Sequence, residues 1–280
     1  MAKCGVCFRK CEIKEGELGL CGARTCINGE VVPDNYGKMT SLALDPIEKK
    51  PLRRFFPGTL VLSYGSYGCS LRCPFCQNHE ISWSNEAVRF RDEADEITPE
   101  ELAETAKYYE KDKNIGVAYT YNEPLVGYEF VRDTAKLVHE KGMKNILVTS
   151  GNASISVLDE LAPYIDAMNI DLKGFTDRYY KDVIKGDLQM VKEFIEASVK
   201  FCHVEITTLI IPGENDTEDE MCSLSKWISN LNGMGDIPLH ISRFFPRFHM
   251  TDREATEVEQ VYKLAEVARE NLKYVYTGNC

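Results

Sequence analysis

From residue 59 onward, short β-branched or aliphatic runs alternate with longer amphipathic stretches. Each run has the length of a buried strand, and each stretch has the apolar spacing of a helix that covers one face of a sheet. This alternation is typical of repeated strand–helix units around a parallel sheet. The predicted strands span residues 60–64, 116–120, 145–149, 167–171, 204–211 and 239–242, and the predicted helices lie near 99–113, 125–141, 154–162, 187–201, 217–231 and 253–272.

The number of strands predicts an incomplete barrel. A closed eight-unit barrel takes about 250 residues, whereas the segment 59–280 yields only six strands, with a long loop after the first. We therefore expect an α/β fold in which residues 59–280 form a partial (β/α)6 TIM-like barrel. In such folds the chemistry lies at the carboxyl ends of the strands, so the residues just after each strand are the candidate site.

Residues 1–58 follow a different pattern, rich in Gly, Cys and charge and without a helical period. We expect a small Cys-rich metal-binding appendage followed by extended segments. Of the eleven cysteines of the chain, eight fall before residue 77. No signal peptide is visible, so reduced thiols and a cytoplasmic location are expected, and metals explain the clustering better than disulfides do.

Four of these cysteines are spaced as a closed tetrahedral site for zinc or iron, or as the ligands of an auxiliary cluster. They are Cys4, Cys7, Cys11 and Cys21, with Cys26 as a spare thiol. Free, buried thiols are the alternative interpretation.

The charge balance of the chain argues only against certain classes of binding partner. The chain carries 33 Lys and Arg against 44 Asp and Glu, a net charge of -11. An acidic surface repels phosphate backbones and anionic lipid, so we expect no membrane partner, and the charge disfavours broad nucleic-acid binding. No run approaches the roughly 20 apolar residues of a membrane span.

A second cysteine group, CxxxCxxC, follows the first predicted strand as Cys69, Cys73 and Cys76. Three thiolates on one loop can bind three irons of a cubane cluster and leave the fourth iron open to a substrate. Structural zinc is the alternative, but such a site wants four ligands and this loop offers three.

With Phe75 beside the last cysteine, this triplet resembles the radical S-adenosylmethionine (SAM) superfamily. The resemblance implies that Cys69, Cys73 and Cys76 hold a 4Fe-4S cluster whose open iron binds the amino and carboxylate groups of SAM, and that Phe75 flanks the adenine. A low-potential donor such as flavodoxin or ferredoxin would reduce the cluster.

The resemblance also implies contacts to SAM from residues after the later strands. Glu123 would meet the methionine ammonium, although Asn122 departs from the two glycines that precede this glutamate in the family. Taken singly, these positions also fit a rim ion pair or an interior histidine. The implied contacts are Asn122, Glu123, Ser150, Asn152, Asp171, Lys173 and His240.

Within the superfamily, the chain resembles proteins named pyruvate formate-lyase activating enzyme-like, and especially the AmmeMemoRadiSam-system radical SAM enzymes. The segments 19–22, 43–52, 73–78 and 119–124 carry this likeness. It implies a 5'-deoxyadenosyl radical that takes hydrogen from a protein or peptide. A small molecule or RNA is the alternative substrate, and a non-catalytic zinc scaffold or binding module is the alternative of another class.

Overall fold

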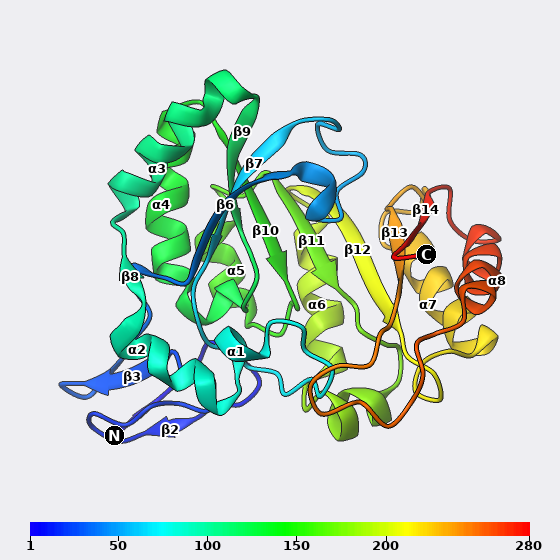
Figure 1. The fold of residues 1–280 in the computed structure, drawn as a ribbon, viewed down its shortest axis with the longest axis horizontal. Coiled ribbons are helices and arrows are strands. Elements are labelled where there is room, and N and C mark those ends of the chain that lie inside the picture. Colours follow the sequence, from blue (N-terminus) through cyan, green and yellow to red (C-terminus); the bar gives the residue numbers. More distant parts are fainter.

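The computed structural model describes all 280 residues, and its centre is one eight-stranded, mainly parallel sheet that forms an incomplete barrel (Figure 1). The strand order is β6, β7, β9, β10, β11, β12, β13, β14, and only β6 runs antiparallel to its neighbour. The strands are β6 (Ser41–Pro46), β7 (Leu60–Gly65), β9 (Asn114–Tyr119), β10 (Lys144–Thr149), β11 (Ala167–Asp171), β12 (His203–Ile210), β13 (Leu239–Arg243) and β14 (Val275–Gly278).

The helices connect successive strands and cover the outer face of this sheet (Figure 1). Their first turns explain where two of them begin. Thr98 caps α3 by accepting from the Glu101 amide at 3.2 Å, while the Glu101 carboxylate accepts from the Thr98 amide at 2.8 Å. Thr217 caps α7 with its side chain alone, which accepts from the Glu220 amide at 3.3 Å. The main helices are α3 (Pro99–Tyr108), α4 (Tyr128–Glu140), α5 (Ile155–Leu161), α6 (Leu188–Ser198), α7 (Glu218–Asn230) and α8 (Val258–Arg269).

Shorter helical turns lie in the connections. Three of them, α1, η2 and α2, belong to the long segment after β7. The short elements are η1 (Ile47–Lys49), α1 (His79–Ser82), η2 (Asn85–Arg89), α2 (Phe90–Glu93), η3 (Tyr109–Asp112), η4 (Pro124–Gly127) and the π-helical turn η5 (Tyr179–Val183).

The six predicted strands are all present, with ends within two residues of the expected ones. The predicted α/β class and incomplete barrel are therefore confirmed. Two further strands extend the sheet, β14 at one edge and β6 at the other. Because β6 pairs with β7 from Ser41↔Gly65 to Pro46↔Leu60, the sheet begins inside the range predicted as the appendage.

The segment 47–58, between β6 and β7, covers the amino ends of the strands. Ile47 and Leu52 are fully buried and pack on the inner face of the barrel, against Val61, Ala118, Ile146 and Ala167. Polar contacts fix the same segment, since Asn169 in β11 donates to the Pro51 carbonyl at 2.9 Å. The segment 47–58 thus closes this end of the barrel.

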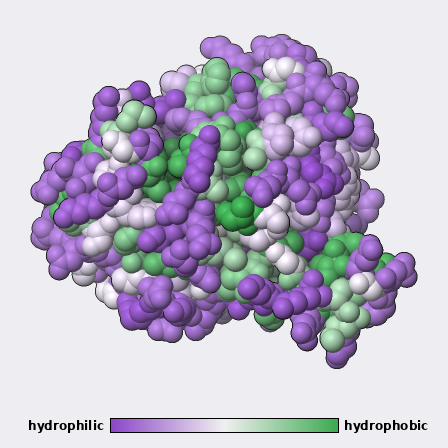
Figure 2. Space-filling view, turned by 180° about the vertical axis from the view of Figure 1, so that it is seen from behind, coloured by the Kyte–Doolittle hydropathy of each residue, from purple (hydrophilic) through white to green (hydrophobic).

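The rest of the N-terminal region lies at the opposite end, near the carboxyl ends of the strands (Figure 1). It consists of two-stranded sheets too short to enclose a core of their own. From behind, polar side chains cover most of the molecule, and the N-terminal hairpins project at the lower right (Figure 2). No helix is both long and apolar enough to span a bilayer. The small sheets pair β1 (Ala2–Lys3) with β2 (Glu12–Ile13), β3 (Arg24–Ile27) with β4 (Glu30–Pro33), and β5 (Lys38–Met39) with β8 (Asp95–Glu96).

One buried carboxylate ties the segment 47–58 to the sheet. Glu205 in β12 is fully buried and accepts from the amides of Arg53 at 3.0 Å and Arg54 at 2.7 Å. It also contacts Nε2 of His203 at 3.0 Å and of His240 at 2.6 Å. Burial raises the pKa of Glu205, but these hydrogen bonds outweigh it and lower the pKa to about 2.

Glu205→Gln should lower the free energy of unfolding at neutral pH by about 3 kcal/mol, because an amide group replaces a carboxylate that accepts from several buried donors. The lowered pKa stabilises the fold above the ordinary glutamate pKa, and this contribution disappears as pH falls toward 2. The difference between the variant and the parent chain, measured by denaturant unfolding, should therefore shrink in acid. Glu196→Gln, at an exposed position of α6, is the matched control. Equal stabilities at neutral pH would contradict this account.

Candidate active site

The loop after β7 presents the cysteine triplet at the carboxyl end of the sheet. Cys69, Cys73 and Cys76 are all free thiols; Cys73 is buried and the other two are partly exposed. Burial raises the pKa of Cys73 to about 12 and the pKa of Cys69 well above its usual range, and the nearby Glu123 carboxylate adds to the effect on Cys69. Without a metal these thiols stay protonated, and a bound cation would take the place of the protons.

Asn122, in the turn after β9, holds this loop by its backbone. Its Nδ2 donates to the carbonyls of Tyr67 at 3.0 Å and Gly68 at 3.1 Å, and its Oδ1 accepts from the Ser66 amide at 3.2 Å. The sequence predicts Asn122 as a contact of SAM, whereas all these bonds go to the triplet loop. Its side chain therefore positions the loop, which explains why asparagine can stand where the family has glycine.

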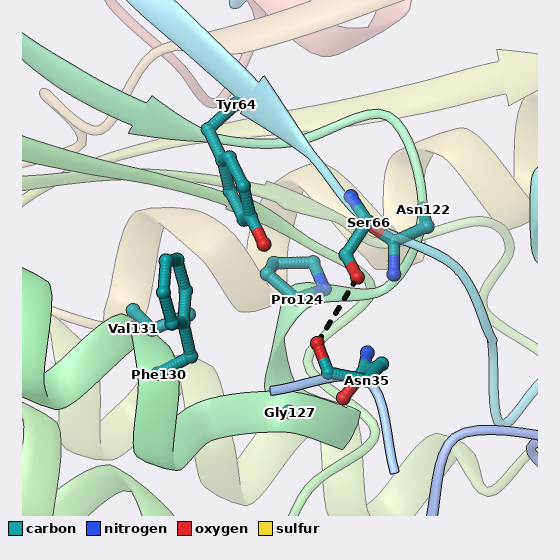
Figure 3. A pocket seen from close by; sticks show the side chains of 8 residues that line it. All are labelled: Asn35, Tyr64, Ser66, Asn122, Pro124, Gly127, Phe130 and Val131. Atoms are coloured by element: carbon teal, nitrogen blue, oxygen red, sulfur yellow. Dashed lines mark hydrogen bonds between the residues drawn. The ribbon is translucent and has the colours of Figure 1, made fainter. Parts of the chain in front are cut away.

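A small cavity lies behind Asn122, between the loop and α4 (Figure 3). The Ser66 hydroxyl and the Asn35 carbonyl meet across it at 3.5 Å. The Asn35 side chain donates to the Tyr67 carbonyl at 2.9 Å, while its own Oδ1 is buried without a partner. The β7 end of the loop is thus fixed by two asparagines that donate to the same Tyr67 carbonyl.

Glu123 lies next to Cys69 with its carboxylate buried and held by the turn after β10. Oε1 accepts from the Thr149 hydroxyl at 2.7 Å and the Leu125 amide at 3.1 Å. Oε2 accepts from the amide of Ser150 at 2.9 Å and from its hydroxyl at 2.5 Å. The structure thus brings together Glu123 and Ser150, as the sequence predicts, and adds Thr149, which the prediction omits. Together they fix a negative charge at the mouth of the barrel.

Asp171 and Lys173 follow β11 and form an ion pair at 2.8 Å. Lys173 lies close enough to Cys73 that its charge opposes the effect of burial on the pKa of that thiol. The pair therefore lies beside the triplet, and its contact with SAM stays a prediction.

The remaining predicted residues, Phe75, Asn152 and His240, each contact a different part of the chain. Phe75 is buried and meets Phe244 edge-on, 6.4 Å between ring centroids. Asn152 accepts from the Asp187 amide at 2.9 Å, a contact that orients the start of α6. His240 shares a row across the sheet with Thr207 and Asp171, yet its Nε2 is bonded to Glu205.

A buried hydrogen-bond network on the inner face of the barrel is not predicted from the sequence. Asp45 in β6 accepts from Tyr121 at 2.7 Å and from Lys50 and Ser63, each at 2.9 Å. Although burial opposes it, these hydrogen bonds lower the pKa of Asp45 well below its usual range. The signal in the sequence is a lone acid inside an apolar strand, which burial permits only when the charge is paired.

A model of the radical SAM superfamily matches residues 63–224, which contain the triplet, Glu123 and the Asp171–Lys173 pair. The chain belongs to the radical SAM superfamily. It is 42% identical over 280 residues to the uncharacterized protein MJ0808 of Methanocaldococcus jannaschii, covering 99% of this chain and 81% of that one. It is 26% identical over 178 residues to the pyruvate formate-lyase 1-activating enzyme of Escherichia coli, covering 61% of this chain and 70% of that enzyme.

Solved structures share the radical SAM fold at low sequence identity. SuiB of Streptococcus suis with SAM bound aligns with a TM-score of 0.60 at 12% identity, over 79% of this chain and 52% of SuiB. SuiB with its precursor peptide SuiA aligns with a TM-score of 0.59 at 13% identity, over 78% of this chain and 48% of SuiB.

Membership of the radical SAM superfamily implies a 4Fe-4S cluster and SAM, and the donor set of this loop fits the cluster. Three free thiols from one loop suit three irons and leave the fourth iron for a substrate. No group of three or more His, Cys, Asp or Glu side chains is already arranged to hold a metal ion. The thiols therefore have to turn toward a common centre when the cluster binds.

Asn122→Asp should loosen the triplet loop, because a carboxylate cannot donate to the Tyr67 and Gly68 carbonyls. We expect a loss of about 2 kcal/mol in the free energy of unfolding and faster amide hydrogen exchange at residues 67–69. Asn85→Asp, at an exposed position of η2, is the control. Unchanged exchange at those amides would show that Asn122 does not hold the loop.

Proposed function

We propose that this chain cleaves SAM reductively at a cluster held by Cys69, Cys73 and Cys76 and takes hydrogen from a protein or peptide substrate. The observation that carries the proposal is the three-thiol loop beside the fixed Glu123 carboxylate at the carboxyl ends of the strands. When bound and reduced by a donor such as flavodoxin or ferredoxin, the cluster supplies one electron that breaks a carbon–sulfur bond of SAM, releasing methionine and the 5'-deoxyadenosyl radical that abstracts the hydrogen.

The chain's own residues bind and orient SAM. Glu123 offers its negative charge to the methionine ammonium, and its hydrogen bonds to Thr149 and Ser150 keep that charge in place during binding. Phe75 and Phe244 supply an apolar surface that excludes water near the loop. Asp171 and Lys173 supply polar contacts at the neighbouring strand end.

A protein or peptide substrate is supported by two observations. The chain is similar to an activating enzyme, and SuiB binds a precursor peptide on the same fold. The sheet also has two free ends, because β6 and β14 do not pair with each other. An incomplete barrel leaves a side opening through which an extended segment of a partner can reach the inner face.

We also infer a second metal at the N-terminal cysteines Cys4, Cys7, Cys11 and Cys21. These four residues line one small cavity, although they lie on separate turns of the chain.

The substrate class is tested by tracing hydrogen. Reduced enzyme is incubated with cell extract and SAM, and the extract proteins carry deuterium at their exchange-resistant carbons. We expect deuterium in 5'-deoxyadenosine. Transfer only when the metabolites of the extract carry the label would overturn the protein or peptide proposal and favour a small molecule, and transfer from labelled RNA would favour RNA.

Cys73→Ala should abolish 5'-deoxyadenosine formation and remove the iron of the triplet, because two thiolates do not hold a cubane. The measurements are product analysis by mass spectrometry and iron content after anaerobic purification. Cys202→Ala is the control, since Cys202 contacts the Ser198 carbonyl before the amino end of β12 and lies outside the loop. Zinc in place of iron in the parent chain would support a scaffold instead of an enzyme.

A further inference from the structure

We propose that Cys4, Cys7, Cys11 and Cys21 bind one tetrahedral metal ion, Zn²⁺ or Fe²⁺, and that this ion holds the triplet loop in position. Metal binding is argued from the N-terminal cavity alone, whereas the positioning of the triplet loop rests on the proposed function of the triplet. The two parts of the proposal can therefore fail separately.

The cavity brings together four thiols from separate turns of the chain. They line it together with apolar residues, Arg9 and Arg24, and all four are free. Cys4, Cys7 and Cys21 are buried, while Cys11 is partly exposed. Four thiolates are a complete ligand set for a structural tetrahedral site. A closed set of this kind leaves no open position and therefore suits a positioning role.

Two tight turns present these thiols. In the first, Lys10 adopts a left-handed conformation with φ of 47° and donates its amide to the Cys7 carbonyl at 3.2 Å. The Cys4 amide then bonds the Cys11 carbonyl at 2.8 Å, which closes the loop between them. In the second, Gly22 at φ of 74° donates to the Gly19 carbonyl at 2.9 Å, with Cys21 inside the turn. The backbone thus gathers the four cysteines around one space, and their thiols, which are not yet arranged to hold an ion, have to turn toward it when the ion binds.

Two guanidiniums, Arg9 and Arg24, also line the cavity, and one of their donors is unused. Arg24 lines the same cavity and is buried, and its Nε has no hydrogen-bond partner. A metal-bound thiolate is an acceptor that would satisfy this donor. The other end of the guanidinium is paired with Glu129 at 2.7 Å.

The site is joined directly to the triplet loop. The carbonyl of Cys21, a proposed ligand, accepts from the amide of Cys69 at 3.1 Å. The Arg72 guanidinium bridges the two segments, since it donates to the Leu20 carbonyl and, at 2.8 Å, to the Cys69 carbonyl. A side chain at Gly68 would place its Cβ 2.5 Å from the Cβ of Ala23. An ion that fixes Cys21 therefore fixes the backbone of Cys69.

The fifth N-terminal cysteine supplies a matched control. Cys26 is fully buried, but its Sγ faces the Glu15 carboxylate at 3.6 Å and it does not line the cavity.

Metal binding is tested in the full chain with Cys69, Cys73 and Cys76 all changed to Ala, so that the triplet contributes nothing. We expect one zinc or iron per chain by elemental analysis, no acid-labile sulfide, and a tetrahedral thiolate spectrum after exchange with Co²⁺. Adding Cys7→Ser should remove the ion, and adding Cys26→Ser should not. Absence of metal would overturn the site, and several irons with sulfide would overturn the single ion.

Positioning is tested in the chain with an intact triplet. Cys7→Ser should raise the amide exchange rate of Cys69 about tenfold and alter the electron paramagnetic resonance spectrum of the reduced cluster, while Cys7→His, which keeps a metal ligand, should restore both. Arg72→Gln keeps all four ligands, so it tests the link even if Cys7→Ser does not fold. It should retain the ion yet show faster exchange at Cys69. Parent-like exchange and spectrum in a folded chain that has lost the ion, or parent-like exchange in Arg72→Gln, would overturn the positioning role.

Discussion

The peptide bond between Gly68 and Cys69 is the point on which the candidate site depends. Its carbonyl accepts from the Asn122 side chain and the Glu123 amide, and its N–H donates to the Cys21 carbonyl. Gly68 adopts a φ of 95° and faces the Cys21 carbonyl so closely that a Cβ would lie 2.9 Å from it, which only glycine permits. The N-terminal region, the triplet loop and the turn after β9 therefore meet at one rigid peptide, although they are far apart in sequence.

This geometry places thiols and a carboxylate close together in positions that are largely buried from solvent. Burial and the charge of Glu123 oppose ionisation of Cys69, and Lys173 offsets the effect of burial at Cys73 only in part. Such an arrangement is unfavourable for the thiolate state without a cation and favourable with one, since a metal ion removes the protons and balances the charge. The hydrogen bonds that fix Glu123 on both oxygens keep the carboxylate from turning away to relieve the repulsion.

The hydrophobic pattern predicted the six central strands and the incomplete barrel, because buried parallel strands carry continuous apolar runs. The pattern missed β6, since its partner β7 is antiparallel and its residues lie in a segment whose glycines and cysteines suggest a loop. At the site, the likeness to a family placed Glu123 and Ser150 together. The roles of Asn122 and Asp45 were not predictable, because they depend on backbone carbonyls and on side chains that only the fold brings near.

The two ends of the barrel are stabilised by different kinds of interaction. The amino ends of the strands are closed by the apolar packing of Ile47 and Leu52 and by the hydrogen bonds of the buried Glu205. The carboxyl ends are covered by short sheets and loops that hold eight cysteines and little apolar core. Small segments without a core of their own usually need metals or disulfides to fold, and the proposed metal sites would supply that support at this end. The two cysteine groups are joined there by the hydrogen bond from the Cys69 amide to the Cys21 carbonyl.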